Sequence, residues 1–107
     1  MTPYAVVLVT ASAADEAGRI ARALVEERLA ACANIIPQVR SLFHWEGKLC
    51  NEAESLIVLK ARAADVEAII ARVRALHSYT VPEVIALPIL AGSPAYLAWV
   101  EESTARP

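Results

Sequence analysis

The sequence has little cysteine, no excess of basic charge and no long apolar run. Its two cysteines, Cys32 and Cys50, lie far apart and form no CxxC motif, which favours reduced thiols over a disulfide framework and predicts a cytoplasmic protein. The formal net charge of −2 provides no basic field for phosphate backbones, which argues against nucleic acid as a partner. The apolar run Tyr4 to Val9 is far shorter than the ~20 residues of a membrane span, so no membrane partner is expected.

Apolar residues are what the sequence has in excess. Hydrophobic types make up 57% of its 107 residues, above the ~45–50% typical of globular domains, and alanine supplies much of the difference. A chain of this length forms one domain, so residues 1–107 are expected to share one core. A small domain this apolar keeps apolar surface after folding, which favours association with other subunits.

The first part of the chain predicts a strand followed by a helix. The continuously apolar stretch Tyr4 to Thr10 is typical of a central strand covered on both faces. Ser12, with Asp15 three positions later, predicts a capped helix start, and the helix is expected to run to about Arg28. Its charged residues are expected to form a solvated face, namely Asp15, Glu16, Arg19, Arg22 and Glu26.

A long β-ribbon is predicted next. A strand from Ala30 to Ile36 continues past Pro37 with alternating side chains to Trp45. The segment Glu46-Gly47-Lys48 is the turn, and the return strand covers Leu49 to Leu59. Because the ribbon is long, its tip is expected to project beyond the core and to pair with another chain.

The remaining elements complete an α+β fold. In order, we expect a second helix over Ala63 to Leu76, a buried strand over Val84 to Ile89, a short helix over Pro94 to Val100 and a frayed tail over Glu101 to Pro107. The order is therefore βαββαβ with a C-terminal helix. Two interleaved right-handed βαβ halves give a ferredoxin-like sandwich with both main helices on one face of an antiparallel sheet.

Three chemistries found on this fold are disfavoured by the sequence. The loop Ala11-Ser12-Ala13-Ala14 lacks the paired thiolates of a copper metallochaperone, and it lacks the glycines and arginine of an acylphosphatase-like anion cradle. An RNA-recognition sheet interleaves aromatic and basic residues on its central strands. The corresponding stretches, Tyr4 to Thr10 and Leu56 to Leu59, are aliphatic apart from Tyr4.

Five ordered motifs make the sequence similar to a known family. They are RLAACANIIP at Arg28 to Pro37, FHWEGK at Phe43 to Lys48, the spacing of Glu54 and Lys60, HSYTVPEVIALPI at His77 to Ile89, and YLAW at Tyr96 to Trp99. On these motifs, which extend over nearly the whole chain, the sequence resembles the CutA family of divalent-cation tolerance proteins.

The resemblance implies a ferredoxin-like subunit that forms a homotrimer through its strands, similar in architecture to the PII signalling proteins. It implies a role in tolerance of copper and other divalent cations. It implies neither an organic cofactor nor a defined reaction. The matching motif positions are expected to line a pocket between subunits, namely Cys32, Trp45, Lys60, His77, Tyr79 and Glu83. Some copper-binding members have a cysteine and a second histidine where this chain has Val9 and Leu76, and His44 replaces neither.

Individual residues have more than one interpretation at this stage. His77 is the first choice of metal ligand and Cys32 the second, for copper or another divalent cation. Equally, His77 would interact with the end of its helix, and Cys32 would fill the core. Lys60 and Glu83 would bind a ligand with Trp45 and Tyr79, or form a structural ion pair.

Two alternative functions remain open. One is an enzyme acting on a small anionic metabolite, with Lys60 holding its charge and His77 or Glu83 as acid or base. The other is a trimeric scaffold that anchors a partner protein. Neither paired carboxylates nor an activated nucleophile supports the enzyme, so the favoured hypothesis is a metal-binding or small-ligand-binding protein with a possible signalling role.

Overall fold

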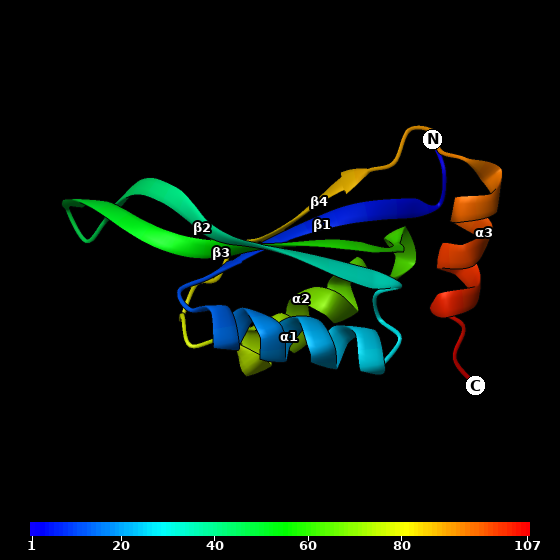
Figure 1. The fold of residues 1–107 in the computed structure, drawn as a ribbon, viewed down its shortest axis with the longest axis horizontal. Coiled ribbons are helices and arrows are strands. Elements are labelled where there is room, and N and C mark those ends of the chain that lie inside the picture. The colour runs from blue at the N-terminus through cyan, green and yellow to red at the C-terminus, as the bar shows by residue number, and fades with distance from the viewer.

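The chain folds as one four-stranded antiparallel sheet with three helices (Figure 1). The computed structural model describes all residues, 1–107. The elements are β1 Tyr4–Ala11, α1 Ala14–Glu26, β2 Cys32–Trp45, β3 Lys48–Arg62, a 3₁₀ turn Ala63–Asp65, α2 Val66–Leu76, β4 Val84–Pro88 and α3 Pro94–Ser103. The strand order is β2-β3-β1-β4, with α1 and α2 on one face and α3 at one end of the sheet. The predicted βαββαβ order and α+β class are confirmed.

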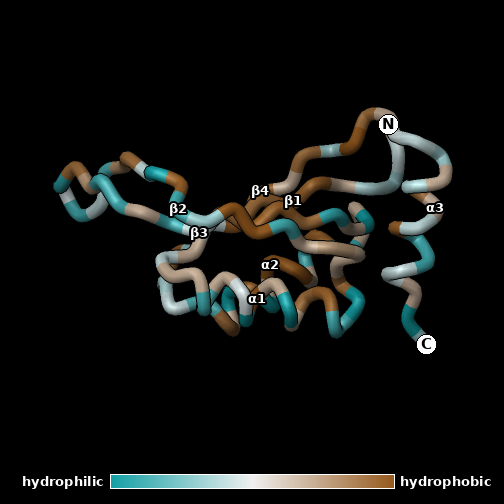
Figure 2. The backbone as a smooth tube through the Cα atoms, in the orientation of Figure 1, coloured by the Kyte–Doolittle hydropathy of each residue, from teal (hydrophilic) through white to brown (hydrophobic).

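Only one face of the sheet is covered by helices, which corrects the prediction for β1. Along β1, alternate residues such as Val7 and Val9 are buried against α1 and α2, while those between them are half-buried. The edge strand β4 was expected to be buried, but Ile85 is 52% and Leu87 is 48% exposed. Figure 2 shows hydrophobic residues along both strands. The continuous apolar pattern therefore leaves a broad apolar surface on the helix-free face.

The core lies between this sheet and the two main helices. Its fully buried side chains include Ile20 and Leu24 of α1, Ile57 and Leu59 of β3, and Ile69 and Val73 of α2. Burying each such side chain contributes about 1.5–3 kcal/mol to folding. The sheet-facing stripes of both helices were predicted from helical spacing, and these residues confirm them.

The ribbon of β2 and β3 projects well beyond the helices (Figure 1). Glu46 and Gly47 have φ values of 50° and 77° and form a two-residue turn between the paired Trp45 and Lys48. Turns of this type match the twist of the strands that they join. A bulge between Ile36 and Val39 places Pro37 where no ladder hydrogen bond is needed. The projecting ribbon is confirmed, and the predicted turn is confirmed at Glu46 and Gly47, whereas Lys48 already belongs to β3.

The start of α1 differs from the prediction. The helix begins after Ala13 without a side-chain cap and ends at Glu26, two residues before the expected Arg28. The Ser12 hydroxyl donates instead to the Glu16 carboxylate, at 3.4 Å. The pairs Asp15–Arg19 and Arg22–Glu26 are solvated as expected, whereas Glu16 is only 5% exposed. One residue of the predicted solvated face is thus buried.

The C-terminal tail, expected to be frayed, is held against the domain. The fully buried Thr104 donates its hydroxyl to Val100 O at 2.8 Å and accepts a hydrogen bond from Arg62 Nε at 2.9 Å. Arg106 forms an ion pair with Asp65 at 2.9 Å. These contacts join residues far apart in the sequence, which local composition does not reveal. None of the helices has the length and apolar character that crossing a membrane requires.

Candidate functional site

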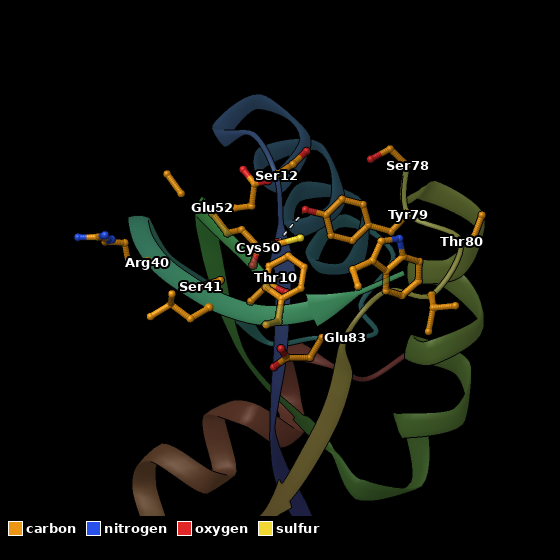
Figure 3. Close-up of a pocket in the computed structure, with 16 residues that line it drawn as sticks. Thr10, Ser12, Arg40, Ser41, Cys50, Glu52, Ser78, Tyr79, Thr80 and Glu83 are labelled. Carbon is orange, nitrogen blue, oxygen red and sulfur yellow. Dashed lines mark hydrogen bonds between the residues drawn. The ribbon is translucent and has the colours of Figure 1, made fainter. Parts of the chain in front are cut away.

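A pocket of about 970 Å³ lies between the ribbon and the linker that joins α2 to β4 (Figure 3). The linker contributes Tyr79 and Glu83, and the ribbon contributes Trp45, Glu52 and Glu54. Arg40 is the one basic residue of the lining. Three carboxylates against one guanidinium give the pocket a negative potential, which favours a positively charged ligand.

His77 lies behind the linker wall rather than in the pocket. Its side chain is fully buried, and Nε2 is 2.7 Å from the Thr10 carbonyl oxygen. Nδ1 accepts a hydrogen bond of 3.0 Å from the Tyr79 N–H. Because a carbonyl oxygen only accepts, Nε2 carries a proton in this arrangement. To ligate a metal, His77 would have to give up one of these two hydrogen bonds.

Glu16 fixes the same linker from the side of α1. Its Oε2 accepts a 2.8 Å hydrogen bond from the Ser78 N–H and lies 3.9 Å from His77 Nδ1. Burial by itself would raise the pKa of this carboxyl, but the hydrogen bonds from Ser78 and the proximity of His77 outweigh it, so the pKa is lowered. Glu16 was predicted on the solvated face of the helix, and its role in holding the linker was not predicted. The available signal was its position four residues before Ile20, on the sheet-facing stripe of the helix.

Tyr79 joins the linker to the ribbon. Its hydroxyl donates a 2.7 Å hydrogen bond to Glu54 Oε2, drawn as a dashed line in Figure 3. Burial and this hydrogen bond raise the pKa of the Tyr79 phenol to about 12, so the phenol remains a donor at neutral pH. Glu54 belonged to a family motif, but it was not among the predicted site residues. The linker is thus bound to β1, α1 and β3, which makes it a defined wall of the pocket.

Cys32 and Lys60 lie at a different place on the sheet. They face each other across β2 and β3, with Lys60 Nζ donating to Asn34 Oδ1 and Cys32 Sγ 3.6 Å from the Tyr96 hydroxyl. The hydrogen bond with Cys32, together with burial, raises the pKa of Tyr96 to about 12. Lys60 makes no ion pair with Glu83, because Glu83 precedes β4 on the far side of β1.

The six predicted site residues therefore divide into three groups. Trp45, Tyr79 and Glu83 line the pocket, His77 lies behind its wall, and the third group, Cys32 with Lys60, occupies the helix-free face near α3.

The single chain does not supply a metal site from these side chains. No three of its His, Cys, Asp and Glu side chains converge on a point that would hold an ion. Thr10, which holds His77, pairs with Leu56, whereas Cys32 pairs with Lys60. Leu56 and Lys60 are four positions apart on β3, so the strand positions beside the two predicted ligands are about 13 Å apart.

Comparison with known proteins gives consistent matches over most of the chain. The family model described as "CutA1 divalent ion tolerance protein" matches residues 5–103. A divalent-cation tolerance protein of Thermus thermophilus is 46% identical over 92% of this chain and 96% of its own. A chloroplastic CutA protein of Arabidopsis thaliana is 44% identical over 95% of this chain, which spans only 56% of that protein.

Solved structures agree with the fold. A divalent cation tolerance protein from Thermus thermophilus superimposes with a TM-score of 0.92 at 45% identity, covering 95% of this chain and 99% of that one. A protein from Archaeoglobus fulgidus, called a periplasmic divalent cation tolerance protein, gives a TM-score of 0.92 at 38% identity, with coverage of 95% and 99%.

The cytoplasmic location predicted from the sequence is contradicted by these relatives. Their names place one in the chloroplast and another in the periplasm. The prediction rested on two unpaired cysteines, and a protein with few cysteines needs no disulfide in either oxidising or reducing surroundings. Free thiols therefore do not identify the compartment.

Proposed function

The chain belongs to the CutA1 divalent ion tolerance protein family, and we propose that it contributes to cation tolerance by binding divalent cations or a small ligand as a homotrimer. The observation that carries this proposal is the pocket lined by Glu52, Glu54 and Glu83. Its carboxylates attract cations, and its walls come from the ribbon and the linker, the segments best placed to meet another subunit. Trp45 and Tyr79 complete it on the apolar side.

The negative charge of the pocket disfavours the alternative enzyme. An anionic metabolite would meet three carboxylates and a single guanidinium, Arg40. Lys60 was the residue predicted to bind the negative charge of the metabolite, but it lies elsewhere on the sheet, where it donates to Asn34. The relative from Thermus thermophilus is likewise named for cation tolerance and not for a reaction.

Self-association is supported by the apolar helix-free face and the exposed ribbon. We expect light scattering at micromolar concentration to give about three times the mass of one chain, as in a closed cyclic oligomer. Ile85→Glu, on the exposed face of β4, should lower that mass because a buried unpaired carboxylate is costly. Ala68→Glu on the exposed side of α2 is the matched control and should leave it unchanged. A monomeric mass for the unmodified protein would contradict the proposal.

For the metal, we propose that Cys32 is the accessible candidate ligand, and that His77, which is fully buried in its own chain, joins it only by giving up its hydrogen bond with Thr10 or Tyr79. A thiolate prefers a soft ion such as Cu(I). Cys32→Ser is expected to weaken Cu(I) affinity about tenfold or more, measured anaerobically by competition with a chromophoric chelator. Cys50→Ser, which removes the other free thiol, is the control. Equal affinities in both variants would exclude Cys32 as a ligand.

A further inference from the structure

The ribbon leaves the sheet at a β-bulge (Figure 1). The strand β3 has β1 as a neighbour as far as Ser55, which pairs with Ala11 at the end of β1. Beyond that point, residues 48–54 pair only with β2. Pro37 and Gln38 of β2 both lie opposite Ser55, so the bulge is at this boundary. A bulge bends and twists the strand that contains it, and this one therefore sets the direction in which the ribbon projects.

The backbone of the bulge is in an unusual conformation. Gln38 has a φ of 60°, in the left-handed region that glycine favours. Pro37 has no N–H to donate to the strand ladder. Both residues are exposed, so core packing does not hold them in place. Because such a conformation persists only where the surrounding structure supports it, the bulge depends on the other contacts that fix the ribbon to the domain.

One side-chain hydrogen bond joins the ribbon beyond the bulge to the rest of the chain. It is the 2.7 Å bond that the Tyr79 hydroxyl donates to Glu54 (Figure 3). The other side-chain hydrogen bonds of the ribbon lie within it, and none of the six ion pairs of the chain includes it. A two-stranded ribbon is only marginally stable by itself. The bond between Tyr79 and Glu54 is therefore well placed to hold the ribbon in one direction.

Tyr79 is in turn fixed by the linker. Its N–H donates to His77 Nδ1 at 3.0 Å, and its ring lies 4.5 Å from the His77 ring. His77 is bound to Thr10 near the end of β1. A continuous series of contacts thus runs from β1 through the linker to Glu54 at the base of the ribbon.

We propose that the linker sets the direction of the ribbon, with the bulge at Pro37 and Gln38 as a hinge and the Tyr79–Glu54 hydrogen bond as a latch. Residues 48–54 extend about 23 Å, so a rotation of about 10° at the hinge moves the tip by about 4 Å. Both latch residues line the pocket, so a ligand that replaces either partner frees the ribbon. Occupancy of the pocket and contact between subunits are thereby coupled. The inference rests on the proposed function in one respect, that the ribbon contacts another subunit.

Two spin labels can measure the direction of the ribbon. One is attached at Leu49→Cys, which is exposed on the ribbon, and the other at Ala68→Cys, which is exposed on α2, with Cys32 and Cys50 replaced by serine. Dilution with unlabelled, cysteine-free chains restricts the recorded distances to those within one chain. Tyr79→Phe removes only the latch hydroxyl and should broaden the distance distribution by about 4 Å.

A second tyrosine provides the matched control. Tyr4 donates a 2.9 Å hydrogen bond to Glu101 in α3, away from the ribbon, so Tyr4→Phe should leave the distribution unchanged. Deletion of Gln38 removes the bulge, keeps the strand partners on both sides, and should shift the mean distance. The proposal is overturned if Tyr79→Phe matches the parent protein, if Tyr4→Phe broadens the distribution equally, or if the deletion leaves the mean unchanged.

Light scattering on the same samples separates this inference from the proposed function. A parent protein with the mass of one chain would contradict the homotrimer, whereas the distances within one chain would still test the latch. Unchanged distances in a parent protein and a Tyr79→Phe variant that both have three times the mass of one chain would contradict the latch alone.

Discussion

Replacement of His77 by alanine is expected to lower the free energy of unfolding by about 3 kcal/mol, because it removes a buried ring and two hydrogen bonds. The ring accepts from the Tyr79 N–H, donates to the Thr10 carbonyl and lies 4.5 Å from the Tyr79 ring. Urea denaturation followed by circular dichroism measures the change. His44→Ala, on the exposed ribbon tip, is the control and should change stability by less than about 0.5 kcal/mol.

The two interpretations of His77 give different results in this experiment. A loss below about 1 kcal/mol would contradict the structural role, since an unsatisfied buried donor alone costs about 1–3 kcal/mol. Cu(I) affinity of the same variant, measured where it remains folded, tests the ligand role independently. Unchanged affinity would remove His77 from the metal site, and weaker affinity with intact secondary structure would retain it.

Replacement of Glu16 by glutamine is expected to cost about 1–2 kcal/mol at pH 7, because a charge-assisted hydrogen bond becomes a neutral one. The pKa of Glu16 is lower in the folded protein than its ordinary value of 4.5. Its contribution is therefore fully present above about pH 4.5 and is lost as pH falls through the folded pKa. Unfolding free energies measured from pH 7 to pH 3 should show the parent protein and the variant converging on the acid side.

The control for this prediction is on the same helix. Glu26→Gln alters an exposed carboxylate paired with Arg22, and its effect should stay below about 1 kcal/mol at every pH. A constant difference between Glu16→Gln and the parent protein from pH 7 to pH 3 would show that the depressed pKa does not contribute to stability.

The family resemblance identified relevant residues but did not predict which of them lie close together. It brought together Trp45, Tyr79 and Glu83, which do line one pocket, but it also included Cys32 and Lys60, which lie near Tyr96 and Asn34. A motif records which residues recur and not which of them share a cavity within one chain. The light-scattering and Cu(I) competition experiments test whether a second subunit brings these groups together.

The sequence by itself determined the element order, the projecting ribbon with its Glu46-Gly47 turn, and the apolar stripes of both helices, because these depend on neighbours a few residues apart. Only the tertiary structure decided that Glu16 is buried, that the tail at Thr104 is held, and that His77 faces Thr10. The partners in these contacts are 62, 42 and 67 positions apart in the chain. Buried polar groups form hydrogen bonds with groups that the fold brings close to them. The periodicity of the sequence does not predict partners that are so far apart in the chain.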